Sequence, residues 1–140
     1  RIWTKAMLAA ANVVLLTYEE AQQITQDCRA PKLIAEDIRQ MGPEIVLLKL
    51  GASGIIANTQ YESVHQPGLN VPVCDTTGAG DSIIAAVAYS YLHGHSLANM
   101  VTVANGTGAA CVQKMGAGIN APSRQEVIDV LDHFGFDFVL

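Results

Sequence analysis

The sequence predicts an α/β fold in which a largely parallel sheet is flanked by helices, and two observations predict it. Short apolar runs rich in branched residues alternate along the chain with longer segments of helical periodicity. Half of the 140 residues are hydrophobic, but only 6% are aromatic. Ala, Val, Ile and Leu therefore supply most of the apolar side chains, as expected for a sheet covered on both faces. A chain of this length is expected to form one domain with its own core.

The first half of the chain alternates between helical and strand patterns. Branched apolar runs predict buried strands, and one helix is bounded by Pro at its start and a Gly-Pro pair at its end. A glycine-containing turn at 51–54 between two apolar runs predicts a hairpin. The expected elements are a helix before residue 12, a strand over 12–17, helices over 19–25 and 31–41, and strands over 45–50 and 55–58.

The second half is mostly helical and contains one polar, glycine-rich segment at 74–81. Ser96 is a candidate N-cap, and Ser123 with Glu126 forms a capping-box pattern ahead of the last helix. The expected elements are an edge strand and loop over 61–73 that ends in a short strand at 71–73, helices over 82–92, 96–115 and 127–134, and a loop over 116–122.

Charge and cysteine content exclude several classes of protein. Lys and Arg number 8 against 13 Asp and Glu, which gives a net charge of −5 without any basic run, so nucleic acid is not an expected partner. No apolar stretch reaches the ~18 residues of a membrane span, and the start of the chain lacks a signal-peptide layout, so we expect a cytoplasmic protein without a membrane partner.

The cysteines, Cys28, Cys74 and Cys111, are odd in number and widely spaced in the sequence. This pattern predicts reduced, buried thiols rather than disulfides or a zinc site.

The segment at 75–81, which reads DTTGAGD, stands between an expected strand and a long expected helix. The first amides of a helix have no partner within it, and the helix dipole adds partial positive charge there. Gly78 and Gly80 lack Cβ atoms, so an anion can approach these amides closely and the chain can adopt positive φ angles. The segment therefore predicts an anion site at a helix start.

Asp81 places a carboxylate beside this predicted anion site, where it would repel a phosphate. A hydroxyl group suits it better, because an ionised carboxylate can orient and deprotonate an alcohol while amides stabilise charge on a transferred phosphoryl group. The plain alternative is that Asp81 only caps the helix. Spacing alone leaves both interpretations open.

The string DTTGAGDS at 75–82 closely resembles the signature of the PfkB (ribokinase-like) family, whose members transfer the γ-phosphate of ATP to a sugar hydroxyl. Residues 17–21 resemble the family's Asn-x-x-Glu segment, 49–54 its glycine turn, and 105–117 its closing adenine-side helix and loop. The resemblance covers the whole chain but only the second half of a family member. We therefore expect residues 1–140 to be the C-terminal nucleotide-binding and catalytic part of a PfkB-type kinase domain with a ribokinase-like fold, the lid and N-terminal half being absent.

This resemblance implies roles for individual residues of the glycine-rich segment. Asp81 would be the catalytic base, and the amides of Gly78, Ala79 and Gly80 would form the anion hole. Both assignments agree with the physical interpretation of the segment.

The nucleotide contacts implied by the resemblance lie outside that segment. Lys49, Gly51 and Gly54 would line the nucleotide phosphates, and Asn105 would lie near the adenine or ribose. A plain alternative for Lys49 is that it ends its strand and reaches water.

Metal sites are implied as well. Asp75 and the carbonyl of Thr77 resemble a monovalent-cation site, usually for potassium, although an Asp that starts a turn is the plain alternative. Thr17 stands where the family usually has Asn, while the family's Glu, which organises water around magnesium, is retained as Glu20. Thr17 and Glu20 also form a capping-box pattern, so capping and a magnesium relay both remain open. If both hold, Thr at position 17 weakens magnesium-linked turnover.

These expectations combine into an ATP-dependent sugar kinase, a phosphotransferase with an alcohol acceptor. Its cofactors would be ATP and Mg²⁺, with K⁺ as a further candidate, and its partners a small sugar and, at full length, a second copy in a homodimer. One alternative is a noncatalytic nucleotide-binding fragment, because acceptor contacts lie in the absent half. Another is a nucleoside or pyridoxal-type kinase of the same superfamily.

Overall fold

The computed structural model describes residues 2–137, with side chains from residue 4 onward. The chain divides into two compact units, Arg1–His65 and Gln66–Leu140. No helix in the described range is long and apolar enough to cross a membrane.

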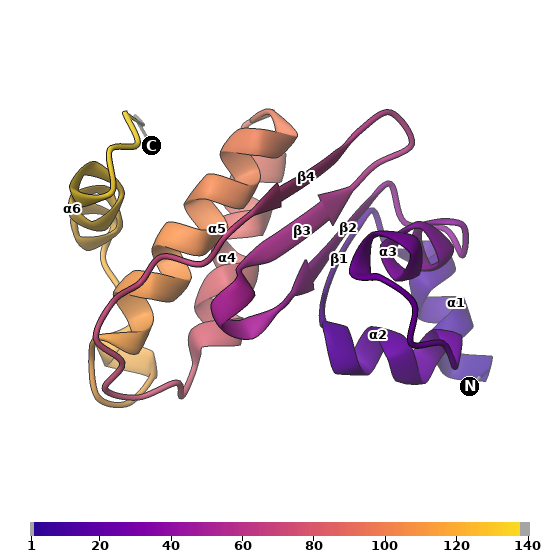
Figure 1. Cartoon of the computed structure of the whole chain (residues 1–140), viewed down its shortest axis with the longest axis horizontal. Helices are drawn as coiled ribbons and strands as arrows, with labels where there is room; N and C mark the ends of the chain where they lie inside the picture. The colour runs from indigo at the N-terminus through magenta and orange to yellow at the C-terminus, as the bar shows by residue number, and fades with distance from the viewer. Residues whose placement is uncertain (1, 138–140) are drawn as a thin grey trace. The chain divides into compact units, whose positions relative to one another are not determined.

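The first unit is built on a four-stranded sheet in which the strands lie in chain order, with the last strand ending at Gln66 (Figure 1). Strands β1 and β2 are parallel, with Val13 opposite Ile45, whereas β2 and β3 are antiparallel, with Leu47 opposite Ala57. The strands are β1 (Val13–Thr17), β2 (Ile45–Lys49), β3 (Ile55–Asn58) and β4 (Ser63–Gln66). The predicted hairpin is confirmed. The sheet is mixed rather than largely parallel, because the turn between β2 and β3 is far too short for the crossover that parallel strands need.

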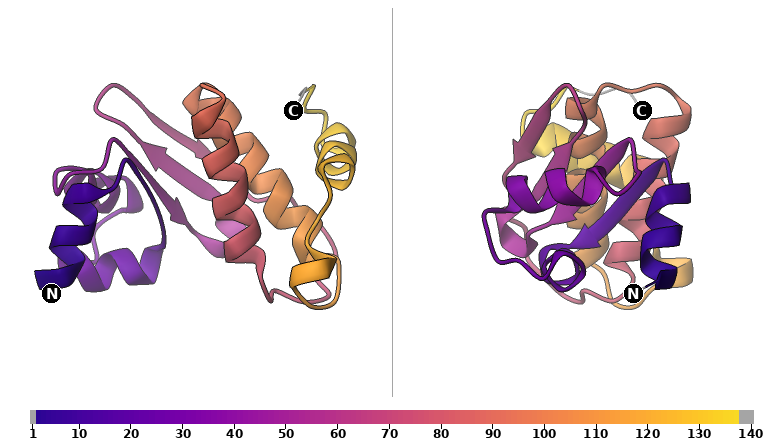
Figure 2. Two further views of the ribbon diagram at one scale, coloured as in Figure 1. Left: turned by 180° about the vertical axis from the view of Figure 1, so that it is seen from behind. Right: turned by 90° about the vertical axis from the view of Figure 1, so that its right-hand side faces the viewer.

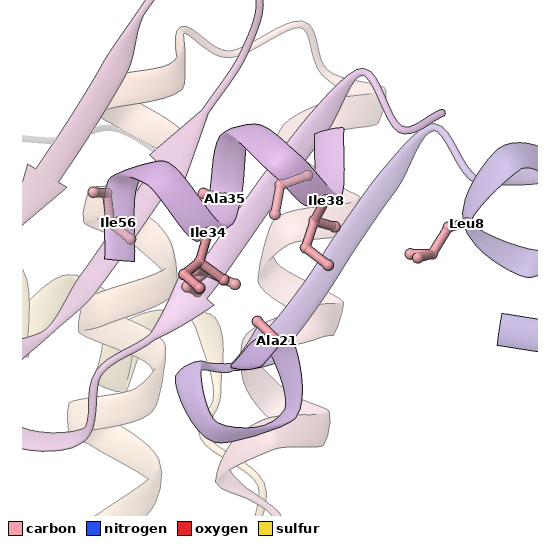
Figure 3. Packing of buried hydrophobic residues seen from close by; sticks show 8 residues of the cluster. Leu8, Ala21, Ile34, Ala35, Ile38 and Ile56 are labelled. Atoms are coloured by element: carbon pink, nitrogen blue, oxygen red, sulfur yellow. The ribbon is translucent and has the colours of Figure 1, made fainter. Parts of the chain in front are cut away.

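One face of this sheet is covered by helices α2 (Tyr18–Thr25) and α3 (Pro31–Arg39), which follow α1 (Ile2–Ala10) in the chain. Alternate strand residues point to this face, so β-strand periodicity decides which side chains join the core. Figure 3 shows the aliphatic side chains of α2 and α3 turned toward the strands. The buried cluster contains Leu8, Ala21, Ile34, Ala35, Ile38, Val46, Leu48 and Ile56.

The second unit is helical. Helices α4 (Ala79–Leu92) and α5 (Leu97–Val112) lie side by side, and α6 (Arg124–His133) packs on α5 (Figure 2). Glycines allow this close approach. A Cβ added at Gly106 would lie 2.7 Å from the side chain of Leu131, and one at Gly108 would lie 3.0 Å from Ile83.

Most of the predicted elements are present in the structure, within a few residues of their expected ends. The strand expected at 71–73 is wrong, because this segment has no regular structure; Pro72 has no N–H for a ladder. Helix α4 begins at Ala79 rather than Ser82, and α5 ends at Val112. The three cysteines are free as predicted, but Cys28 and Cys74 are exposed and only Cys111 is buried.

Candidate functional site

The glycine-rich segment forms a turn that leads directly into α4. Gly78 is the N-cap residue with φ +77°, a conformation that glycine adopts without strain. The amide of Ala79 donates to Thr76 O at 3.2 Å. By contrast, the amides of Gly78, Gly80 and Asp81 have no acceptor among residues 2–137. Two of the three predicted anion-hole amides are thus unengaged, and the third is already used within the turn.

Asp81 is the third residue of α4 and is exposed to solvent. No side-chain hydrogen bond caps the helix at Gly78, and the Asp81 carboxylate makes no hydrogen bond in the described part of the chain. The capping interpretation of Asp81 is therefore wrong. The carboxylate lies in the first turn of a 14-residue helix, where the helix dipole stabilises negative charge.

Asp75 is the residue that organises the turn. Its Oδ1 accepts from the amide of Thr77 at 2.9 Å and from the Thr77 hydroxyl at 2.7 Å, and its Oδ2 accepts from the amide of Gly116 at 2.8 Å. These bonds, led by that of the Thr77 hydroxyl, hold the pKa of Asp75 below its usual range. The turn-starting role that the sequence allowed for Asp75 is confirmed.

The loop after α5 closes against the same turn. A Cβ added at Gly78 would lie only 2.7 Å from the Cβ of Ala117. The family resemblance placed Gly116 and Ala117 in the adenine-side loop, but it did not place them against Asp75 and Gly78, which lie far away in the chain. Their glycine-alanine pattern was visible, but nothing local linked it to Asp75.

Asn105 is 8% exposed and lies within α5. Its Nδ2 donates to Gln66 O at 3.2 Å and to Pro67 O at 3.1 Å. Both amide protons therefore link α5 by hydrogen bonds to Gln66 and Pro67, the first two residues of the second unit. Of this side chain, only Oδ1 remains as a group that could meet a nucleotide.

In the first unit, three predicted residues come together at one end of the sheet. Thr17 and Lys49 are opposite each other at the ends of β1 and β2. The Thr17 amide donates to Glu20 Oε2 at 2.7 Å, and the Glu20 amide donates to Thr17 Oγ1 at 3.2 Å. The capping box is confirmed. The Thr17 amide lowers the pKa of Glu20, and the charge of Lys49 adds to this effect.

Lys49 is half-buried at the end of β2 and precedes the short 3₁₀ turn Gly51–Ser53. Gly51 has φ +59° and Gly54 has φ +91°, so both positions favour glycine for backbone reasons. The amide of Gly54 donates to Gly51 O at 3.0 Å, which closes the turn. His65 adds a contact to Ser53 O at 2.9 Å.

Glu20 also lines a cavity of about 850 Å³ within the first unit, together with polar residues of α1, α2 and α3. Its Oε1 makes no hydrogen bond to any residue that the structure describes. No group of three or more His, Cys, Asp or Glu side chains that could hold a metal ion occurs in the described range. A metal ion at Glu20 would thus have to keep most of its water molecules or take its other ligands from a bound small molecule.

Comparison with known proteins decides the family. The model of the pfkB family carbohydrate kinases matches residues 4–124. The chain belongs to this family. A ribokinase of Haemophilus influenzae is 26% identical over 137 residues, which are 95% of this chain and 45% of the relative. An uncharacterized sugar kinase of Archaeoglobus fulgidus is 36% identical over 88 residues, or 63% of this chain and 35% of the relative.

Solved structures support the same assignment. Arabidopsis thaliana ribokinase, solved with ribose and ATP, has a TM-score of 0.81 and 26% identity over 96% of this chain and 44% of its own. The ribokinase-like fold is therefore confirmed. The chain spans less than half the length of each of these relatives.

Proposed function

We propose that this PfkB chain carries the nucleotide-binding and phosphoryl-transfer part, residues 1–140, of an ATP-dependent sugar kinase. The observation that carries the proposal is the start of α4. There an exposed, unengaged carboxylate of Asp81 follows directly on the unengaged amide of Gly80. This arrangement offers an acceptor for a proton and donors for an anion at neighbouring positions.

The proposed step is a transfer between two oxygens. The hydroxyl oxygen of the sugar bonds to the γ-phosphorus of ATP, and the bond from that phosphorus to the bridging oxygen of ADP breaks. Asp81 orients the hydroxyl and accepts its proton as the transfer proceeds. The amides of Gly78 and Gly80 stabilise charge on the phosphoryl oxygens. Ala79 contributes less, because its amide already donates to Thr76.

On the nucleotide side, we assign Lys49, Gly51 and Gly54 to the phosphates. Lys49 supplies a positive charge at the end of β2, and the glycine turn that follows presents backbone without obstructing Cβ atoms. Asn105 would approach the adenine or ribose through Oδ1 only. Support for ATP as the donor comes from family membership and from the ATP-bound Arabidopsis ribokinase.

Magnesium fits Glu20 as a ligand of its water shell. The free Oε1 of Glu20 is one exposed carboxylate oxygen, and no acidic cage is present among the described residues. Mg²⁺ keeps several waters and binds through one or two carboxylates and the substrate phosphates. When bound, it would neutralise charge on the phosphates of ATP.

Potassium at Asp75 and Thr77 and a homodimer of the full-length protein stay predictions. The chain itself supplies three donors to the Asp75 carboxylate, so the turn is held without a cation. A comparison of turnover in KCl and in LiCl tests whether a monovalent cation adds to it.

The test of the proposal is Asp81→Asn, which keeps the shape of the side chain but cannot take up the proton. Turnover should be measured with MgATP and a sugar panel beginning with ribose, and ATP affinity by calorimetry. We expect kcat to fall by about 10²–10⁴-fold and the ATP Kd to stay within about twofold. The matched control is Asp132→Asn, an exposed aspartate of α6.

Three outcomes would overturn parts of this proposal. An equal loss of turnover and ATP affinity in Asp81→Asn removes the assignment of Asp81 as base. ATP binding without turnover on any acceptor makes the chain a noncatalytic nucleotide-binding module. Turnover on nucleosides or pyridoxal but not on sugars moves it to another kinase class within the superfamily.

A further inference from the structure

A buried thiol lies directly behind the turn that carries Asp81. Cys111 belongs to the last turn of α5 and is 2% exposed. Its Sγ accepts a hydrogen bond from Ser82 Oγ at 3.6 Å, and its S–H group donates to Thr77 O at 4.0 Å. Thr77 and Ser82 are the residues on either side of the segment from Gly78 to Asp81. One side chain therefore contacts both ends of that segment.

The next residue along α5 holds the start of the same turn. The carbonyl oxygen of Val112 accepts from the amide of Cys74 at 2.7 Å and from the amide of Asp75 at 3.2 Å. Residues 111 and 112 thus contact the turn both before and after its glycine-rich part. The end of α5 therefore supports this turn.

The glycine-rich part of the turn needs support from neighbouring residues to keep one conformation. Gly78 and Gly80 have no side chains, and glycine loses more conformational freedom on ordering than any other residue. Ala79 offers only a methyl group. The position of the Gly80 and Asp81 amides therefore depends on contacts made by the flanking residues, and Cys111 makes two of them.

A thiol suits this place for two reasons. Cys is a small side chain that is often fully buried, so it fits between tightly packed helices. It is also a weak donor and a weak acceptor at once, which matches the carbonyl of Thr77 on one side and the hydroxyl of Ser82 on the other. An aliphatic side chain of similar size would fill the space without making either bond.

We propose that Cys111 is a positioning residue that fixes the Gly78–Asp81 segment in the arrangement needed for phosphoryl transfer. The proposal rests on the function proposed above for Asp81. Cys111 acts through Thr77 and Ser82 and does not touch substrate. Its loss should therefore lower kcat while ATP affinity stays unchanged, since all the hydrogen bonds of the thiol go to the turn.

The test compares Cys111→Val, which fills the site without polar contacts, with Cys111→Ser, which keeps a donor and an acceptor. The control is Cys28→Ser, at an exposed cysteine of the first unit. The first readout needs no activity: amide exchange of Thr77, Ala79 and Ser82, whose amides are hydrogen-bonded within the turn, and ¹⁵N chemical shifts of Gly78, Gly80 and Asp81 in the full chain. We expect exchange in Cys111→Val to be at least about threefold faster at the three hydrogen-bonded amides, and the shifts to change, with Cys111→Ser close to wild type.

The second readout is steady-state turnover. We expect kcat to fall about tenfold in Cys111→Val, because small misplacements of reacting groups are costly, and to recover partly in Cys111→Ser, while KM for ATP changes less than about twofold. If Cys111→Val does not fold, Cys111→Ala takes its place. Equal exchange rates and shifts in the Val (or Ala) and Ser variants would overturn the proposal.

The two readouts separate this proposal from the function on which it rests. If the wild-type chain transfers no phosphate, the function proposed for Asp81 fails, and the exchange data still decide whether Cys111 fixes the turn. If turnover is present but Cys111→Val matches wild type in kcat, the positioning role fails and the kinase assignment stands.

Discussion

Asp75 Oδ2 accepts a hydrogen bond of 2.8 Å from the amide of Gly116, and this bond joins two loops that lie 41 residues apart in the sequence. Together with the bonds from Thr77, it makes the carboxylate the centre of the turn that precedes α4. Position 75 thereby couples the geometry of the glycine-rich segment to the loop after α5.

We predict that Asp75→Ala loosens both loops at once. The amides of Thr77 and Gly116 lose their acceptor, so their hydrogen exchange should become faster and the unfolding free energy should fall. Asp132→Ala, at an exposed position of α6, is the matched control and should change neither. Unchanged exchange at Gly116 in Asp75→Ala would contradict the structure of this turn.

The lowered pKa of the Glu126 carboxyl group leads us to predict that the free energy of unfolding depends on pH. Lys114 Nζ lies 2.8 Å from its carboxylate, and with the Ser123 amide of the capping box it lowers the pKa of Glu126 from 4.5 to about 2. Because the folded pKa lies below the unfolded one, this stabilisation is present above about pH 4.5 and is lost as the pH falls toward about 2.

The measurement is urea unfolding at several pH values between 7 and about 2.5. Glu126→Gln should reduce the loss of stability on acidification, whereas Glu62→Gln, in the exposed turn between β3 and β4, should leave it unchanged. An identical pH profile for wild type and Glu126→Gln would refute the assignment.

The cysteines should differ in reactivity. Cys28 and Cys74 are exposed, and Cys111 is buried. With a thiol reagent such as Ellman's disulfide, we expect two thiols to react quickly in the native protein and the third only on unfolding. The variants Cys28→Ser and Cys74→Ser should each remove one fast phase. A third fast phase in the native protein would show that Cys111 is accessible.

The close packing of Gly106 against Leu131 leads to another prediction. A methyl group there would lie 2.7 Å from the Leu131 side chain, so Gly106→Ala should destabilise the protein by about 1–3 kcal/mol despite the higher helix propensity of Ala. Leu131→Val should relieve part of this cost in the double variant, which a double-mutant cycle in urea would detect. Additive effects of the two substitutions would mean that α5 and α6 do not meet there.

Local signals in the sequence predicted much of this structure. The two capping boxes, at Thr17 with Glu20 and at Ser123 with Glu126, depend on residues three positions apart, and both are present. The hairpin followed from a short glycine turn, since such a connection permits only antiparallel strands. These features need no knowledge of distant parts of the chain.

What the sequence could not predict depends on distant contacts. The segment at 71–73 has a strand-like composition, yet the amides of Cys74 and Asp75 that follow donate to Val112 at the end of a helix. The role of Cys111 beside Thr77 depends on how α5 packs, and no spacing rule reports it. The sequence likewise indicated Asp75 as a turn residue but not its bond to Gly116.

The last prediction separates the two roles of Thr17. As an N-cap, Thr17 accepts from the Glu20 amide at 3.2 Å, so Thr17→Ala should cost about 1 kcal/mol of stability. Thr17→Asn keeps a good cap and should leave stability nearly unchanged. If position 17 also helps to order water around magnesium, Thr17→Asn should raise turnover at limiting Mg²⁺.

The control is Ser96→Ala, which removes a comparable cap in α5, where Asn99 N donates to Ser96 Oγ at 3.2 Å. This variant should lower stability without changing the dependence of turnover on magnesium. An identical magnesium dependence in Thr17→Asn and wild type would restrict Thr17 to capping, because its hydroxyl would then serve only the backbone of α2.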